Sequence, residues 1–268
     1  MAYFTICDYQ TLFPSIKLEP CFCELRDFLL EKVEGSYKYL PDVLDLSHLM
    51  VHSSFFKYEG VTYMQTRGVP MGSPISGILC ELVIRKHENT ILPKFQEDIA
   101  LSVRYINDVL IIWNKVPNID LVLNYFNDNP YGLSLKVEQE SQTTVHFLDI
   151  TIKMEQGHLS TCVFRKESYT PLFIHNSSHD PYSYKVYAFL ALVKRVHTHC
   201  LEQKEKENKL LRIKNALAMQ QGYPSSLVKH LINQYINRRE RNMPQDEQMR
   251  VITNNKIFSN IYRDCKDY

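Results

Sequence analysis

The sequence predicts an α+β protein with an antiparallel sheet in its first part and helices in its second. Apolar, β-branched runs alternate with helical patterns up to about residue 154, in the order strand, helix, strand, strand, helix, strand. That order is typical of a split βαβ unit. From Pro181 onward the apolar spacing is helical. We therefore expect a sheet domain over residues 1–155 and a mainly helical domain over residues 156–268.

The first elements follow from local patterns. The apolar run YFTIC predicts an opening strand that ends near Asp8. Apolar positions at helical spacing predict helices over 20–34 and 41–53. The segment 55–65 predicts a hairpin, because Glu59-Gly60 lies between two β-forming runs.

The middle and end of the chain are predicted in the same way. Ser73-Pro74 opens a helix that reaches about Leu92, with proline in the first turn, where the missing N–H costs nothing. A hairpin around Asn107 follows, and then come a helix over 118–128 and strands over 133–139 and 144–154. Three helices end the pattern, over 183–203, 204–220 and 224–240.

Composition and charge narrow the class of protein. The 268 residues are 44% hydrophobic and 12% aromatic, which is typical of a globular protein. Residues 1–160 contain 13 Lys and Arg against 20 Asp and Glu, whereas residues 161–268 contain 18 against 10. An acidic half suits cations and a basic half suits phosphates, although two helical surfaces with different solubilising charge would give the same numbers.

The lack of a recognisable signal peptide and the pattern of cysteines predict an intracellular protein, in the nucleus or the cytoplasm. The N-terminus lacks the basic region and apolar core of a signal peptide, and no apolar run approaches the ~20 residues of a membrane span. We therefore expect no membrane partner. The seven cysteines are odd in number and have no Cys-x-x-Cys spacing, so we expect reduced thiols.

Three segments carry the chemistry. Asp8 ends the first strand, the Gly/Pro-rich segment Gln65–Ser76 opens a helix, and Tyr105-Ile106-Asn107-Asp108 lies at a hairpin tip. Asn-Asp is also an ordinary turn sequence. Beside the other two segments it indicates a site for divalent cations, because hard cations prefer oxygen ligands and two of them can clamp a phosphoryl transfer.

These segments resemble the palm motifs of reverse transcriptases, most closely those of Penelope-like retroelements. The segment FTICDYQTLFPSI resembles the first palm motif, QTRGVPMGSPIS resembles the second, and RYINDVLIIW resembles the third. The segment FLDITI (147–152) is similar to the strand that leads into the primer grip. The stretch Phe164–Lys185 is similar to one particular to the Penelope-like group. The resemblance extends to about Leu201, and it implies a palm-like domain over residues 1–155 and a primer-grip segment with a helical thumb over 156–268.

The resemblance also implies residue roles. Asp8 and Asp108 would bind Mg²⁺ or Mn²⁺, with Asn107 in the third catalytic position. Phe13 would lie at the sugar gate, and Gln65 and Gly68 would border the nucleotide and template. The expected nucleic-acid contacts lie in the basic half, at Arg165, Lys166, Lys185, Arg238 and Arg239. The cluster that contains Arg238 and Arg239 could equally solvate a helix end.

Two departures from the family pattern leave two functions open. Asn107 replaces a metal-binding Asp, and Asp8 follows Met1 by only seven residues, so no basic fingers region precedes it. The chain could be an RNA-directed DNA polymerase that needs Mg²⁺ or Mn²⁺ and fingers from a partner chain. Alternatively, it could be a polymerase-derived protein that has lost catalysis, needs no metal, and serves as an RNA-binding or scaffold subunit of a ribonucleoprotein. The expected partner in either case is RNA or an RNA–DNA hybrid.

Overall fold

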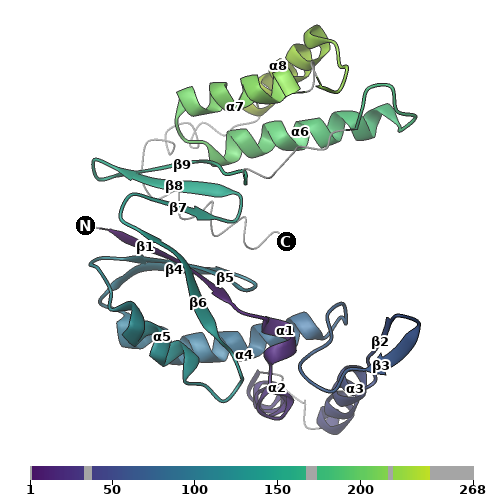
Figure 1. Cartoon of the computed structure of the whole chain (residues 1–268), viewed down its shortest axis with the longest axis vertical. Coiled ribbons are helices and arrows are strands. Elements are labelled where there is room, and N and C mark those ends of the chain that lie inside the picture. The colour runs from purple at the N-terminus through teal and green to yellow at the C-terminus, as the bar shows by residue number, and fades with distance from the viewer. Residues whose placement is uncertain (1, 33–37, 167–173, 217–219, 242–268) are drawn as a thin grey trace. The chain divides into compact units, whose positions relative to one another are not determined.

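The computed structural model describes residues 2–32, 38–166, 174–216 and 220–241 (Figure 1). The chain forms two compact units, Met1–Glu140 and Ser141–Tyr268. The predicted boundary after residue 155 falls inside the second unit, because strands β8 (Ile150–Glu155) and β9 (His158–Val163) pair in one sheet.

The first unit contains a four-stranded sheet in the order β4-β5-β1-β6. Strand β5 is antiparallel to both β1 and β4. Helices α4 and α5 lie along one face of the sheet (Figure 1). This arrangement confirms the predicted α+β class with a split βαβ unit. The bounds are β1 Tyr3–Tyr9, α4 Ser76–Ile91, β4 Ile99–Tyr105, β5 Asp108–Trp113, α5 Ile119–Asn127 and β6 Leu135–Ser141.

Between the sheet and these two helices lies the main core. Alternate residues of β1 and β5 point to the same face, so every second apolar side chain meets the helices. Its fully or nearly fully buried members include Tyr9, Leu79, Val83, Ile111, Trp113 and Phe126. The Trp113 indole donates a 2.8 Å hydrogen bond to the Thr5 hydroxyl across the two strands, so its one polar atom is satisfied.

The other elements of the first unit connect β1 to α4. They agree with the predicted helices and the predicted hairpin, whose turn residues Glu59 and Gly60 both have positive φ (47° and 83°). These elements are α1 Leu12–Ser15, α2 Leu18–Lys32, α3 Leu40–His52, β2 Phe55–Tyr58 and β3 Val61–Met64, and the short η2 Leu92–Phe95 follows α4.

In its described residues, the second unit contains a three-stranded sheet, β7-β8-β9, and three helices. The predicted single strand 144–154 is wrong: it is two strands, β7 (Thr144–Phe147) and β8, because Leu148 takes a φ of 51° and turns the chain. Strand β9 was not predicted, although Gln156-Gly157 forms a turn with φ values of 51° and 82° before it. The predicted helices are confirmed as α6 Tyr182–His199, α7 Gln203–Asn215 and α8 Ser225–Arg241.

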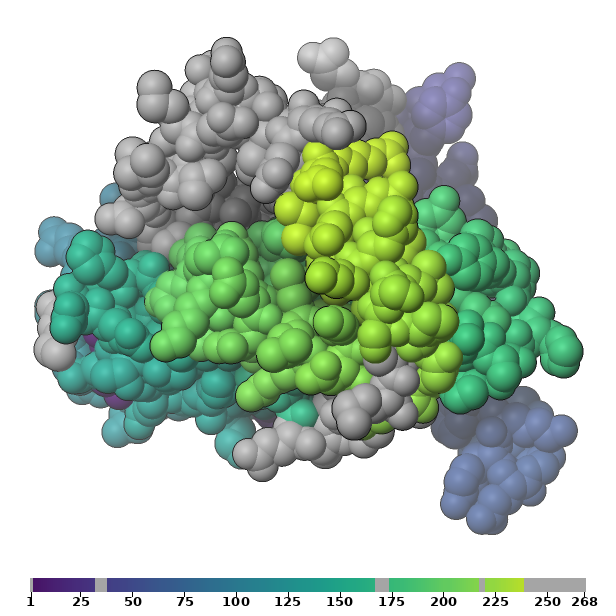
Figure 2. All heavy atoms as spheres, turned by 90° about the horizontal axis from the view of Figure 1, so that it is seen from above, coloured from purple at the N-terminus to yellow at the C-terminus, as the bar shows by residue number. Residues whose placement is uncertain are grey.

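The helices of the second unit enclose a separate core. Phe189, Val193, Val196, Ile213 and Val228 are buried together with residues of β9. Figure 2 shows α7 (green) and α8 (yellow) side by side on one face of this unit. Over the described residues, no helix is long and apolar enough to span a bilayer. The six cysteines within those residues are free thiols, five of them buried.

Gly68 and Gly132 join the loops of the first unit by close backbone contact. A Cβ on Gly68 would lie 2.4 Å from the Phe13 carbonyl oxygen, and one on Gly132 would lie 2.4 Å from that of Ser15. Both glycines have positive φ, 67° and 80°. The Val69 amide also donates to the Phe13 carbonyl at 2.9 Å. The segment after β1 therefore packs between two glycine-containing loops, and a side chain at either glycine would clash with backbone atoms.

We expect Gly68→Ala to lower the free energy of unfolding by about 2–4 kcal/mol, because the new methyl would overlap backbone atoms and the residue would keep a positive φ. Gly72→Ala is the matched control, since Gly72 also has positive φ (89°) but open space around its Cβ. It should cost only about 1–2 kcal/mol. Urea unfolding of both variants measures the difference, and equal losses would contradict the close contact.

Candidate active site and nucleic-acid interface

The end of β1 and the tip of the β4–β5 hairpin form the candidate active site. The strand register places Asp8 directly opposite Asp108, so both carboxylates lie on the same face of the sheet. Asn107 is one of two residues in the tight turn between Tyr105 and Asp108. Its amide nitrogen donates a hydrogen bond to Asp8 Oδ1. The structure thus brings the three predicted catalytic residues together.

Asp8 accepts a second hydrogen bond that was not predicted from the sequence. Gln10 Nε2 lies 2.6 Å from Asp8 Oδ2. Each carboxylate oxygen of Asp8 therefore accepts from a neutral amide, one from each of two segments. The two-residue spacing of Asp8 and Gln10 was the available signal, because residues i and i+2 of an extended chain point to the same side and Gln10 directly follows β1.

Arg104 holds the backbone of the hairpin tip. Its Nη1 donates to the Ile106 carbonyl at 3.0 Å. The same guanidinium binds Glu81 Oε2 at 2.9 Å and Glu88 Oε1 at 2.8 Å, both on α4. Ile106 is a β-branched residue with a φ of 55°, a conformation that costs free energy and persists only where its surroundings hold it. The network therefore connects the helix after the glycine-rich loop to the tip.

Burial and neighbouring charges shift the pKa of each ionisable group in this network in opposite directions. Burial raises the pKa of Glu88, and the Arg104 charge only partly offsets the increase. For Glu81, burial is outweighed by the hydrogen bonds and charges of Arg104 and Arg85, so its pKa is lowered. Burial would lower the pKa of Arg104, but its two carboxylate partners raise it. Arg104 consequently stays charged and keeps its donors for both glutamates and the tip carbonyl.

Phe13, Gln65 and Gly68 lie around the loop that joins β3 to α4. Phe13 is half-buried against the main core, and its carbonyl contacts Gly68 and Val69. Gln65 donates to the Arg67 carbonyl at 2.8 Å and lines a groove of about 700 Å³. Apolar side chains form most of its wall, and Arg67 is the charged residue among them. The lining is Pro14, Ser54, Phe55, Phe56, Met64, Gln65, Thr66, Arg67, Val69, Pro70, Met71 and Ser73.

The donor set at the hairpin tip does not fit a two-metal centre as it stands. Such a centre takes anionic oxygens, and here the third position offers an amide that already bonds to Asp8. Across the described ranges, no three His, Cys, Asp or Glu side chains are grouped as a metal would require. Asp8 and Asp108 can offer carboxylate ligands. Asn107 can offer only a neutral amide oxygen, and only if its side-chain amide rotates to exchange the nitrogen and oxygen positions.

The predicted nucleic-acid contacts lie in the second unit. Lys166 is exposed and Arg165 is half-buried just after β9. Lys185 is buried instead, and its ammonium donates to the Asn176 and Ser178 carbonyls at 2.8 Å each, so it fastens the loop before α6. A phosphate contact at Lys185 stays a prediction, and it would compete with these two bonds.

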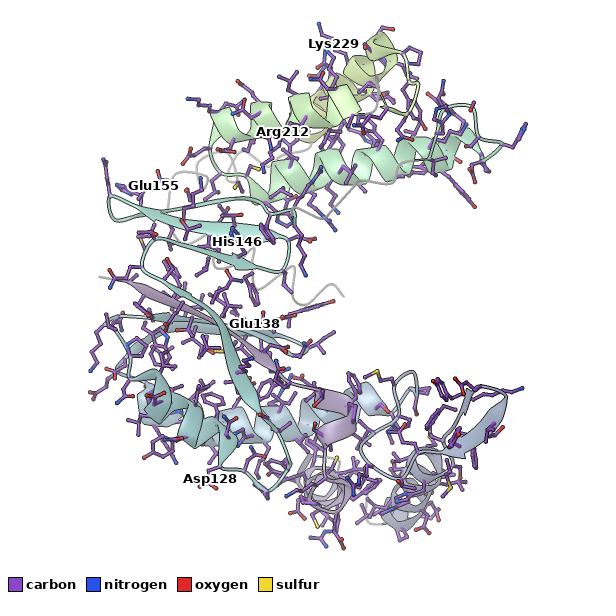
Figure 3. The ribbon with its side chains drawn as sticks, in the orientation of Figure 1. Asp128, Glu138, His146, Glu155, Arg212 and Lys229 are labelled. Carbon is purple, nitrogen blue, oxygen red and sulfur yellow. The ribbon has the colours of Figure 1, made fainter. Side chains whose placement is uncertain are left out.

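The remaining predicted contacts, Arg238 and Arg239, lie on α8. Arg238 is exposed on α8, whereas the side chain of Arg239 lies outside the described residues. Arg212 on α7 and Lys229 on α8 are also exposed and were not singled out from the sequence (Figure 3). The signal for Arg212 was the basic end of α7, where Arg212 and Lys214 occupy the last turn.

Sequence comparisons match only parts of the chain. Residues 172–233 match the model of the animal helix-turn-helix domain. Over 62 residues the chain is 36% identical to telomerase reverse transcriptase from Rattus norvegicus, a match that covers 23% of this chain and 5% of that protein.

Solved structures match far more of the chain. Telomerase from Candida albicans in complex with a TWJ fragment of telomeric RNA aligns with a TM-score of 0.61 at 10% identity, over 88% of this chain and 40% of that one. The RNA-dependent RNA polymerase of a human picobirnavirus aligns with a TM-score of 0.53 at 14% identity, over 80% of this chain and 41% of that one. The chain has a reverse-transcriptase-like fold. This reverse-transcriptase-like chain spans about two fifths of the length of either structure.

We expect Arg104→Met to destabilise the protein by about 3 kcal/mol at neutral pH, because it leaves Glu88 buried without its cation. Arg85→Met is the matched control. Arg85 pairs with Glu81 at an exposed position, so its loss should cost about 0.5 kcal/mol or less.

The pH dependence of Arg104→Met separates the charge effect from lost packing. The pKa of Glu88 is already raised in the folded state, and removing Arg104 raises it further. A folded-state pKa above the unfolded value means that stability increases as the pH falls through the interval between them. The deficit of the variant should therefore shrink on acidification from neutral pH. A deficit in urea unfolding that stays constant with pH would mean that lost packing dominates.

Proposed function

We propose that this chain is a palm and thumb of reverse-transcriptase lineage, within the Penelope-like group, that binds RNA or an RNA–DNA template–primer. We propose further that its own RNA-directed DNA polymerase activity is impaired or lost. The observation that carries the proposal is the site at the sheet edge: Asp8 faces Asp108, and Asn107 donates to Asp8 where the family pattern has a third carboxylate.

The size of the impairment follows from electrostatics. Metal ions in phosphoryl transfer stabilise developing charge by several kcal/mol, and a neutral amide holds such an ion less tightly than an anion does. At about 1.4 kcal/mol per factor of ten in rate, losing one charged ligand corresponds to a loss of roughly a thousandfold or more. Residual activity would need Mg²⁺ or Mn²⁺ held by Asp8 and Asp108 alone.

Three observations support a nucleic acid as the partner. The fold neighbours are polymerases of nucleic acid, one of them in a complex with telomeric RNA. The segment 172–233 matches a helix-turn-helix model, and that fold commonly binds nucleic acid. Lys and Arg outnumber Asp and Glu in residues 161–268. A basic surface of this kind supplies the sequence-independent part of binding to phosphates.

A non-catalytic subunit of a ribonucleoprotein is the second candidate, and the hydrogen bonds of Asp8 favour it. Both carboxylate oxygens accept from amides, so the site is satisfied without a cation. Such a subunit would act in the nucleus or cytoplasm beside RNA. A polymerase would also require fingers from a partner chain or from a segment of the same protein beyond this sequence.

Primer extension and metal titration test impaired catalysis together. We expect the protein to extend a primed RNA template with Mg²⁺ or Mn²⁺ no faster than its Asp8→Ala variant. We expect Asn107→Asp to bind Mn²⁺ more tightly in titration calorimetry, because it replaces an amide donor by a third carboxylate. The double variant Asp8→Ala/Asn107→Asp should lose that gain. Extension by the unaltered chain that depends on Asp8 and on metal would refute the impairment.

The salt dependence of RNA binding tests the partner. For a hybrid duplex, log–log plots of affinity against salt should have a slope of about 0.9 for each phosphate neutralised. Replacing Arg165 and Lys166 together by Gln should reduce the slope by roughly 2 if both contact phosphates. Arg26→Gln with Lys115→Gln removes the same charge from exposed ion pairs of the first unit and should leave the slope unchanged. Affinity with no salt dependence would exclude a phosphate backbone as the ligand.

A further inference from the structure

Helix α8 presents one continuous polar face to solvent. Between residues 226 and 238 its exposed side chains recur at intervals of three and four residues, which places them along one side of the helix. To the other described residues they make no hydrogen bond and no ion pair, so their donors and acceptors are available to a ligand. We call this set the polar face of α8, and it consists of Ser226, Lys229, His230, Asn233, Gln234, Asn237 and Arg238.

The opposite side of α8 fixes the direction in which this face points. Val228 and Ile232 are buried in the core of the second unit, and Leu231, Tyr235 and Ile236 pack against that core. A helix anchored by one apolar side cannot rotate about its axis without exposing it. Figure 2 shows α8 (yellow) at the surface of this unit. The polar face is therefore held away from the core.

The composition of the polar face differs from that of an ordinary solvated helix. Helix α7 is the comparison within the same unit, because Lys204, Glu205, Lys206 and Glu207 alternate in charge along it. Such alternation is typical of a surface that only meets water. The polar face of α8 carries cations and carboxamides, and neither Asp nor Glu occurs between residues 225 and 239. A face with cations and no carboxylate attracts phosphates.

The side chains of the polar face are those that read bases. Asn and Gln form bidentate hydrogen bonds with adenine in the major groove, Arg does so with guanine, and Ser bonds to several bases. A helix of about 10–12 Å diameter fits a major groove of about 12 Å. From Ser226 to Arg238 the face extends about 18 Å, at about 1.5 Å per residue. That length corresponds to roughly five base pairs of about 3.4 Å each.

The match to a helix-turn-helix model is a second, independent observation. It covers residues 172–233 and so includes the first half of α8. Proteins of that class place one helix in the major groove, where three or four side chains contact base edges. The polar face offers Asn233, Gln234, Asn237 and Arg238 for such contacts, which is enough for one recognition helix.

The same features distinguish duplex DNA from other macromolecules. The major groove of A-form RNA is deep and narrow, and side chains cannot read it. Single strands are bound on aromatic platforms, and the polar face contains no Phe, Tyr or Trp. The cores of protein interfaces are enriched in Tyr, Trp, Phe and Met, which it also lacks. B-form duplex DNA is the ligand whose shape and chemistry fit this face.

We propose that the polar face of α8 enters the major groove of B-form duplex DNA and reads its sequence. Asn233 and Gln234 contact base edges, and Lys229 and Arg238 bind the flanking phosphates or a guanine. The inference goes beyond the proposed function, because it names a second nucleic acid. It stands whether or not RNA or a hybrid binds at Arg165 and Lys166.

Sequence selection with the full chain tests the proposal. The probe is a pool of short DNA duplexes with a randomised centre, and fluorescence anisotropy then compares the enriched duplex with a scrambled one. We expect the unaltered chain to prefer the enriched duplex by about tenfold or more. The variant Asn233→Ala/Gln234→Ala should reduce that preference to within about twofold.

The matched control removes two exposed carboxamides from α7. Asn208→Ala/Asn215→Ala should keep the full preference for the enriched duplex. Alanine favours helix at exposed positions, so both double variants should fold, and circular dichroism checks this. Replacing purines of the enriched duplex by 7-deazapurines removes N7 acceptors from the major groove. It should weaken the unaltered chain and leave Asn233→Ala/Gln234→Ala unchanged.

Three outcomes would overturn the proposal. The first is a pool from which no sequence is enriched, and the second is an equal loss of preference in the two double variants. The third is an RNA duplex of the enriched sequence that binds as tightly as the DNA, which would assign α8 to phosphates alone. Binding of the RNA–DNA hybrid is measured separately and should be unchanged by Asn233→Ala/Gln234→Ala. Failure of hybrid binding with sequence preference intact would refute the proposed function and leave this inference standing.

Discussion

The register between β1 and β5 is the constraint on which the candidate site depends. A shift of one residue would turn every side chain of β1 to the other face, so Asp8 would leave Asp108 and enter the core. Burial prevents that shift, because Tyr9, Ile111 and Trp113 occupy one face between the sheet and the helices. The Trp113–Thr5 hydrogen bond fixes the same pairing at the far end. The hydrophobic pattern therefore determines where the carboxylates meet.

A second set of restraints acts through backbone and charge rather than through apolar burial. Gly68 lets the loop before α4 touch the backbone after β1, and Arg104 ties α4 to the hairpin tip. Both contacts end at carbonyl oxygens, of Phe13 and Ile106 respectively. Backbone carbonyls restrict geometry without specifying side chains, which lets three segments distant in sequence be held close to a single sheet edge.

The sequence predicted the elements well where a period or a turn residue was distinct. The split βαβ order, the Glu59-Gly60 hairpin and the last three helices follow from such patterns, and so does the meeting of Asp8 with Asn107 and Asp108. The turn at Leu148 was missed because leucine carries no turn preference, and the chain there reads as a continuous strand. The role of Arg104 was not predicted, because its partners Glu81 and Glu88 lie on the preceding helix α4, distant in the sequence. The phosphate contact of Lys185, predicted from the family-like stretch Phe164–Lys185, stays a prediction, and the sequence did not show that its ammonium donates to two carbonyls.

Asn107 makes the electrostatics of the sheet edge different from those of a cluster of three carboxylates. Three carboxylates at the end of two paired strands repel one another, so a cluster of that kind depends on bound cations for part of its stability. An amide at position 107 removes one negative charge and supplies a donor to Asp8, and Gln10 supplies another. The repulsion is then that of the Asp8–Asp108 pair alone. The amide at position 107 thus lowers the charge repulsion at the sheet edge and adds a hydrogen bond there, so it stabilises the edge in the absence of a cation.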